Sequence, residues 1–376
     1  MLKLDDLIIE VQNKEIQGMV TGVTIYETVF GMLKGAIAVT DGMNFFDNFI
    51  GTSLSDVHFK FQYLNKSPII CSFYMDGISE MRIEKQVKKY IIHIESAYVP
   101  SLSEHINAAF SGRSDEIIKS IFTEATKDIN AILECDTKTG TKGKYIAPNI
   151  PARDCLNVLV NNSYDVKQTG MFLYQRLFDN NIVRLTSLYD MLNNHFLNQK
   201  KDRVSIKNSL LSMDNVAGMN TLGTSSKIRL KAYNMDMLKK IENGLWGEEI
   251  NEIGLDETKR THNLTKEATS ISKTKFKLSD KLYSDNVKSV FSTRGNITSS
   301  RVINHKRRVF NTLLNVDEMV ALPNLGVGMS IDVELGGGNK SFSRQDGKYL
   351  ISYIQHKFTQ DSGDFMYSQD VGLVRE

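Results

Sequence analysis

Cysteine is scarce in this sequence, and the few cysteines form no recognisable pair. The 376 residues include only Cys71, Cys135 and Cys155, at wide spacings. A disulfide framework needs an even number of cysteines, and a structural zinc site needs closely spaced cysteine or histidine pairs. We therefore expect reduced thiols in an intracellular protein, with no disulfide and no metal site.

Long apolar runs and an excess of one charge are also missing. No run of about 18 or more apolar residues occurs, so no membrane span is expected. Asp5 and Asp6 argue against a signal peptide. Lys and Arg total 46 against 44 for Asp and Glu, and the basic clusters at 200–203 and 305–308 lack interleaved aromatic residues. We therefore expect a soluble protein made in the cytoplasm that binds neither membranes nor specific nucleic acid.

Catalytic and cofactor motifs are absent as well. The seven histidines are scattered without an H-E-x-x-H pair, and no G-x-S-x-G elbow occurs. The segment Gly336–Ser341 resembles a phosphate loop, but Asn339 stands where a glycine must precede the lysine. A carboxylate pair for glycoside hydrolysis stays open, because such pairs are recognised by their separation in space. We predict no enzyme, no catalytic residue and no cofactor.

Alternation of apolar and polar residues, which predicts strands with one buried face, is present in two regions. The first is residues 1–97, where Met19–Val29 and Leu33–Thr40 are the arms of a predicted hairpin. The tip of this hairpin is Phe30, Gly31 and Met32, and one face of its first arm is Thr24, Tyr26 and Thr28. In the second region, near the C-terminus, another hairpin is predicted, with buried Ile331, Val333 and Leu335 in one strand and Tyr349, Ile351 and Tyr353 in the next.

The segment between these regions has helical spacing and predicts a mixed α/β domain. A helix is expected from Ser114, a favoured N-cap, and another from Pro151, a favoured first helical residue. The second helix is expected to bury Cys155, Leu156 and Leu159. Two strands, Met171–Leu177 and Ile182–Leu188, then flank a turn and form a further hairpin.

Residues 234–299 are polar and contain few large apolar side chains. This composition is typical of disorder, and equally of an insertion that becomes ordered against a partner. After it, Val302, Val309 and Leu313 recur at helical spacing and predict a helix over Arg301–Leu314.

The two β-rich regions have similar order, which indicates one unit present twice. Each contains Asn-Lys-Ser (65–67 and 339–341) and a later Tyr-apolar-Ile (90–92 and 349–351). We therefore predict a β-rich α+β protein with two similar, tube-like antiparallel β-barrels. The expected division is a first barrel in 1–97, a mixed α/β domain in 98–200, a second barrel in 201–233 and 300–376, and a long polar insertion in 234–299 that is extended or partly disordered.

With this order of units, the chain resembles the baseplate hub proteins of contractile-tailed phages and the N-terminal hub part of type VI secretion spike proteins. The resemblance rests on the α/β segment Pro151–Leu192, the lead-in Leu325–Met329 and the closing Gly347–Ser352 that runs on to His356 and Phe358. The resemblance extends over nearly the whole chain, but each motif that supports it is short. The polar segment before Ser300 has no counterpart that can be aligned.

The resemblance implies a homotrimeric ring of pseudo-sixfold symmetry in the virion tail baseplate, assembled in the host cytoplasm. Its implied partners are the central spike protein, the tail tube or tube-initiator proteins, and baseplate wedge proteins. Phe30, Gly31 and Met32 are the candidate tube contacts. Because nothing long enough for a spike follows the second barrel before Glu376, we expect a separately recruited spike. The alternatives are the hub of a phage-derived injection system and a glycan-binding or glycan-hydrolysing tail protein.

Overall fold

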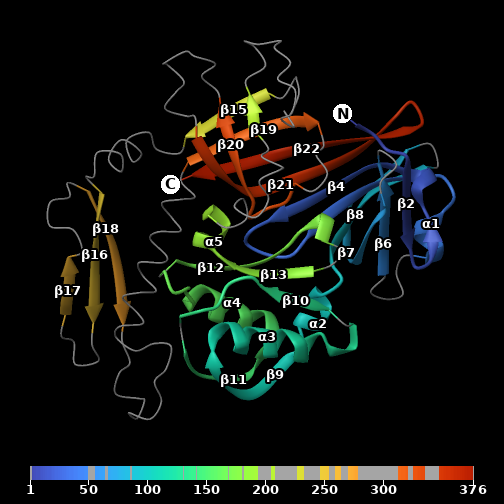
Figure 1. Ribbon diagram of the computed structural model, residues 1–376. Coiled ribbons are helices and arrows are strands. Elements are labelled where there is room, and N and C mark those ends of the chain that lie inside the picture. Colours follow the sequence, from blue (N-terminus) through green and yellow to red (C-terminus); the bar gives the residue numbers. More distant parts are fainter. Residues whose placement is uncertain are drawn as a thin grey trace.

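The computed structural model describes segments of both β-rich regions, of the α/β part between them and of the polar insertion (Figure 1). The described residues are 2–49, 56–63, 67–84, 87–129, 131–140, 142–167, 169–179, 182–193, 205–207, 227–232, 246–253, 259–263, 270–277, 312–320, 325–334 and 347–375. Within them the protein is rich in strands and has few helices, as expected for a β-rich α+β fold.

One large sheet of fourteen strands contains both β-rich regions. Its strands are β1 (Leu2–Lys3), β2 (Asp6–Val11), β3 (Lys14–Glu15), β4 (Val20–Thr28), β5 (Lys34–Asp41), β6 (Asp56–Gln62), β7 (Ile69–Glu84), β8 (Val87–Ser96), β14 (Ser205–Lys207), β15 (Lys227–Ala232), β19 (Thr312–Val320), β20 (Ser330–Glu334), β21 (Gly347–Asp361) and β22 (Asp364–Arg375). The order along the sheet is β15-β19-β22-β21-β4-β5-β8-β7-β6-β2-β3. A 3₁₀ turn, Gln17–Met19, and a short helix, α1 (Phe45–Phe49), connect strands of the first region.

The two β-rich regions meet where β4 pairs antiparallel with β21, and Figure 1 shows these strands side by side. The register runs from Tyr353 opposite Thr28 to Thr359 opposite Gly22. The regions expected to form two barrels are therefore joined edge to edge in one sheet, and their closure into separate barrels stays a prediction. Both hairpins predicted from alternation are confirmed, as β4 with β5 and as β20 with β21.

The apolar face of the sheet follows the predicted alternation. Val57, Phe59 and Phe61 of β6 are fully buried, as is Ile25 of β4. Thr24, Tyr26 and Thr28 lie on the other, more accessible face of β4, as predicted. In the C-terminal hairpin Ile331 and Tyr349 are buried as expected, whereas the side chain of Val333 and residues 335–346 lie outside the described part.

A smaller α/β layer lies beside the sheet, with β12, β13 and α5 between the sheet and the two main helices (Figure 1). It comprises α2 (Val99–Leu102), β9 (His105–Arg113), α3 (Ser114–Ala125), a 3₁₀ turn (Lys127–Ile129), β10 (Ile132–Cys135), β11 (Lys142–Pro151), α4 (Ala152–Asn162), β12 (Met171–Gln175), a second 3₁₀ turn (Leu177–Asp179), β13 (Ile182–Ser187) and α5 (Leu188–Asn193). The predicted helices are confirmed within one residue of Ser114 and Pro151, and Cys155, Leu156 and Leu159 are buried. The hairpin of β12 and β13 is confirmed too.

The segment after the polar insertion corrects one expectation, whereas the expectation that 234–299 is extended or partly disordered stays a prediction. Inside 234–299 the strands β16 (Trp246–Ile253), β17 (Lys259–Asn263) and β18 (Ser270–Lys277) form a three-stranded sheet. The helix expected over Arg301–Leu314 is wrong at its end, because residues 312–314 belong to β19, and residues 301–311 lie outside the described part. Backbone hydrogen bonding of β19 to strands on both sides overrides the local helical period there.

Gly328, in the lead-in Leu325–Met329, fits only without a side chain. Its φ is +75°, and a Cβ there would lie 2.5 Å from the Tyr174 hydroxyl oxygen. We expect Gly328→Ala to lower the free energy of unfolding by about 1–3 kcal/mol, because it combines a left-handed backbone conformation with overpacking. Urea denaturation measures the change. Gly18→Ala is the control, since a Cβ at Gly18 meets no atom within 4 Å; equal stability of the two variants would contradict the argument.

Candidate functional site

The loop between β4 and β5 holds a large apolar side chain open to solvent on a fixed backbone. Phe30 is 64% exposed, whereas Val29 and Leu33 on either side are buried. The Val29 N–H donates to the Ser352 carbonyl oxygen at 3.1 Å. The Phe30 N–H donates to Thr28 Oγ1 at 3.3 Å. An exposed aromatic residue on a tethered loop has the character of an interaction anchor.

The same loop contacts the α/β layer, so all three predicted site residues lie at a junction. The Phe30 ring lies 5.8 Å from the ring of Phe172 on β12, tilted by 59°. The Gly31 carbonyl oxygen accepts a hydrogen bond from the Gln175 N–H at 3.4 Å, and Met32 packs against the apolar core around α3 and α4. The structure therefore brings Phe30, Gly31 and Met32 together; their contact with a tail tube stays a prediction.

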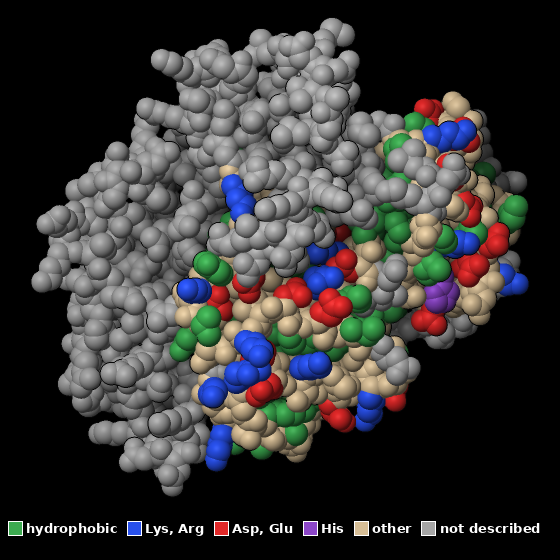
Figure 2. All heavy atoms as spheres, in the orientation of Figure 1, with side chains coloured by type: hydrophobic (Ala, Val, Ile, Leu, Met, Phe, Trp, Pro, Cys, Tyr) green, Lys and Arg blue, Asp and Glu red, His purple; other side chains and the backbone are tan. Residues whose placement is uncertain are grey.

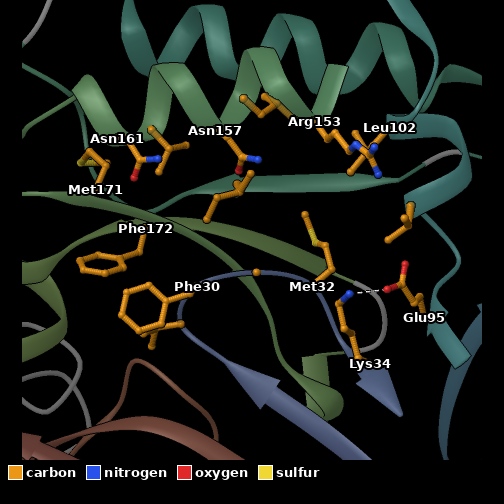
Figure 3. Close-up of a pocket in the computed structure, with 16 residues that line it drawn as sticks. Phe30, Met32, Lys34, Glu95, Leu102, Arg153, Asn157, Asn161, Met171 and Phe172 are labelled. Atoms are coloured by element: carbon orange, nitrogen blue, oxygen red, sulfur yellow. Dashed lines mark hydrogen bonds and ion pairs between the residues drawn. The ribbon is translucent and has the colours of Figure 1, made fainter. Parts of the chain in front are cut away.

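Beside the loop lies a cavity of about 480 Å³, partly open to solvent and lined by the β4–β5 loop, α2, α4 and β12 (Figure 3). Its wall is mostly apolar and includes Phe30 and Phe172. Polar side chains stand at its margin: Lys34, Glu95, Arg153, Asn157 and Asn161. We call this cavity the loop groove. A volume between about 300 and 1,000 Å³ with a few convergent polar groups is typical of ligand sites.

Three polar residues of α4 border the loop groove at a spacing of four. Arg153, Asn157 and Asn161 follow one row along the helix, because residues four apart lie one above the other on a helix. In Figure 3 the two asparagine side chains extend from the helix toward the cavity. Sequence reasoning missed this row; its signal was the spacing of four beside the buried positions Cys155 and Leu159.

Among the charged residues that line the loop groove, Lys34 and Arg153 are cationic and Glu95 is anionic. Lys34 forms an ion pair with Glu95. Within the described part of the chain, the ion-pair partner of Arg153 is Asp154, with 3.9 Å between Nε and Oδ1, and both side chains are more than half exposed. Such a pair contributes little. Elsewhere on the face seen in Figure 2, Lys and Arg side chains are interspersed with Asp and Glu.

Under the loop, at the end of β4, a buried carboxylate joins three parts of the chain. Glu27 Oε2 accepts the Leu177 N–H at 2.9 Å, and Oε1 accepts the Val327 N–H at 2.6 Å. His356 Nε2 lies 3.1 Å from Glu27 Oε2, and both side chains are fully buried. His356 Nδ1 in turn lies 2.7 Å from the Tyr367 hydroxyl. With its proton on Nε2, His356 donates to Glu27 Oε2, and its Nδ1 accepts a hydrogen bond from the Tyr367 hydroxyl. We call these residues the Glu27 cluster.

Burial around the Glu27 cluster keeps neighbouring acids neutral. The thiol of Cys71 donates to the Leu177 carbonyl oxygen at 3.2 Å, and burial, with the charge of Glu27, raises the pKa of Cys71 to about 12. Burial also raises the pKa of Tyr367 above its ordinary value. These groups therefore act as hydrogen-bonding groups of the core and offer no reactive anion. Within the described residues, no cluster of His, Cys, Asp or Glu is placed to bind a metal ion, and no helix there could cross a membrane.

Neither a family model nor a curated protein matches the sequence. Solved structures with a similar fold do exist. The tail protein from Neisseria meningitidis MC58 matches with a TM-score of 0.61 at 8% identity, over 98% of this chain and 97% of that one. The 43 kDa tail protein of prophage MuSo2 from Shewanella oneidensis matches with a TM-score of 0.59 at 11% identity, over 98% of each chain. The chain has a phage tail-protein fold.

The tail-protein fold extends to type VI secretion proteins. An E. coli component of that system, described as structurally similar to the bacteriophage T4 tail proteins gp27 and gp5, matches with a TM-score of 0.50 at 9% identity. The match covers all of this chain and 77% of that one. A chain of the Francisella PdpA-VgrG complex matches at 0.51 and 10% identity, with 99% of this chain and 58% of that one covered. The resemblance that the sequence motifs indicated is therefore confirmed for the fold.

Proposed function

We propose that this protein is a structural component of a phage tail and serves there as the central hub of the baseplate. The observation that supports this proposal is the extent of the match: two tail proteins align over 97% or more of their own length. The hub acts mechanically, without catalysis, as a trimeric ring that joins the tail tube to a central spike. Wedge proteins of the baseplate are further candidate partners.

The arrangement of the large sheet suits a symmetry adaptor. A trimer can meet a sixfold tube only if each subunit presents its docking surface twice. Here the two β-rich regions are joined directly through β4 and β21, so their relative position is fixed by backbone hydrogen bonds rather than by a linker. Phe30, Gly31 and Met32 form the proposed contact in the first region, and an equivalent surface is expected in the second.

A second candidate, favoured by the matches to type VI secretion proteins, is the hub of a phage-derived injection system. The matched chain of the Francisella PdpA-VgrG complex is longer than this one, which covers 58% of it. The mechanical role is the same in both cases. The candidates differ in whether the protein is packaged in virions that carry DNA or in contractile particles without it.

The mass of the purified protein in solution tests the hub proposal. We expect a species of three times the 42.5 kDa chain mass, either for the protein alone or on addition of the spike protein of the same tail. Light scattering coupled to size-exclusion chromatography measures it. A protein that remains a monomer with the spike present would contradict the proposal.

A further inference from the structure

We propose that the loop groove binds a short extended peptide of a partner protein, with an apolar side chain in the groove and a carboxylate near Arg153. This inference rests on the hub proposal, in which Phe30, Gly31 and Met32 contact a partner. It adds the chemistry of the partner segment that binds there. It draws on the cavity between the β4–β5 loop and α4, on the row of polar residues along α4, and on the charge at one end.

The apolar part of the groove fits a large side chain of a partner. Phe30, 64% exposed, and Phe172 form a tilted aromatic pair at one wall. Leu156 and Val160 of α4 also line the groove, and Figure 3 shows α4 across the groove from the loop that holds Phe30. An aromatic or aliphatic anchor in a preformed pocket is the usual centre of a protein–protein contact. Because the loop backbone is already hydrogen-bonded, little ordering entropy is lost on binding.

The asparagine row favours a peptide over other apolar ligands. Each side-chain amide offers a donor and an acceptor, which match the N–H and C=O of a peptide group. Neither Asn157 nor Asn161 forms a side-chain hydrogen bond to another described residue. Residues four apart on a helix are about 5–6 Å apart at Cβ, and peptide groups two residues apart in an extended chain are about 6.6 Å apart. The row can therefore pair with alternate peptide groups of one strand.

The charge of Arg153 determines which second side chain the peptide is expected to carry. From Arg153 to Asn161 the helix rises about 12 Å, at about 1.5 Å per residue, which an extended chain spans in about four residues. The pair of Arg153 with Asp154 is long and exposed and therefore weak, so a carboxylate is favoured at the Arg153 end, where the guanidinium can bind it through two hydrogen bonds. The expected ligand has an acidic residue about three or four positions from an apolar one.

Selection from a random heptapeptide library tests this inference on the full-length protein. We expect enrichment of peptides with that apolar and acidic spacing, and the most enriched peptide, labelled with fluorescein, is then titrated by fluorescence polarisation. Phe30→Ser, Arg153→Glu and the double variant Asn157→Ala with Asn161→Ala are each expected to weaken its binding tenfold or more. All four positions are exposed or lie on the groove margin, so the variants are expected to keep the thermal stability of the parent protein.

Matched controls change the same chemistry elsewhere. Ile83→Ser removes an apolar side chain that is 68% exposed, and Lys127→Glu reverses a charge whose side chain is 59% exposed; both are expected to leave the affinity unchanged. Enrichment of unrelated peptides, or equal binding to the groove variants, would overturn the inference. So would concentration-dependent self-association that these groove variants abolish, because the occupant would then be a second copy of the chain.

The outcomes separate this inference from the hub proposal. A protein that forms the trimer but shows no groove-dependent peptide binding contradicts only the inference. A protein that binds the peptide through the groove but stays a monomer with the spike contradicts only the hub proposal.

Discussion

Replacing Glu27 by alanine is expected to lower the free energy of unfolding by about 3–5 kcal/mol. The substitution removes the acceptor for the Leu177 and Val327 N–H groups and for His356 Nε2, all within 3.1 Å of the carboxylate. Three donors then remain buried without an acceptor, and each costs free energy of desolvation. Because these donors come from three parts of the chain, the loss is expected for the whole fold. Chemical denaturation followed by circular dichroism measures it.

Two further variants test whether the loss of stability comes from the hydrogen bonds of Glu27. One keeps part of the hydrogen bonding without the charge, and the other removes a carboxylate at an exposed position. Glu27→Gln keeps one carbonyl acceptor and is expected to lose less stability than Glu27→Ala. Glu124→Ala removes a carboxylate that is 63% exposed and forms a surface ion pair with Lys127, and it is expected to change stability by less than about 1 kcal/mol. If Glu27→Ala were as mild as Glu124→Ala, the Glu27 cluster would not stabilise the junction.

Replacing Phe358 by alanine is expected to cost about 3–5 kcal/mol of stability, the range for a buried phenylalanine. The Phe358 ring, on β21, lies 5.1 Å from Phe59 and 5.0 Å from Phe61 on β6, and 4.6 Å from Tyr367 on β22, stacked at 6°. All four side chains are fully buried. The cavity left by alanine would therefore open the core between the two β-rich regions, and both are expected to lose protection together. Hydrogen exchange of β6 and β21 measures this directly.

The control for Phe358 is the same substitution at an exposed aromatic residue. Phe30→Ala is expected to change stability by less than about 1 kcal/mol, since the Phe30 ring is 64% exposed. Loss of exchange protection in β21 alone, with β6 unaffected in Phe358→Ala, would show that the two regions fold independently, contrary to the shared aromatic core.

Local patterns were enough to predict the elements whose partners are near in sequence. The β4–β5 and β12–β13 hairpins and the helices α3 and α4 depend on alternation, turn residues and capping, all of which are read within a few residues. Thr312–Leu314 was assigned to a helix because its apolar residues fit that period, whereas its pairing with β22 depends on residues about sixty positions away. The β4–β21 pairing had no local indication.

The candidate site was predictable to a similar extent. The loop tip Phe30–Met32 followed from the hairpin, but the groove beside it needed the position of α4, which only tertiary packing determines. Glu27 did have a signal: Thr24, Tyr26 and Thr28 were assigned to one face, so Glu27 had to share the other with Ile25 and Val29. An acidic residue on an apolar strand face requires buried partners. Their identity, His356 and two backbone N–H groups, could not be read from the sequence.

The pairing of β4 with β21 also has a consequence for biosynthesis. Glu27 and His356 are 329 positions apart, and at about 5–20 residues per second a ribosome needs about 16–66 seconds to pass from one to the other. Throughout that interval the outer edge of β4 has no β21 to pair with, and an open strand edge is a template for pairing with another chain. We expect nascent chains to depend on chaperones until β21 emerges, because the large sheet is complete only in chains whose synthesis has reached the C-terminal hairpin.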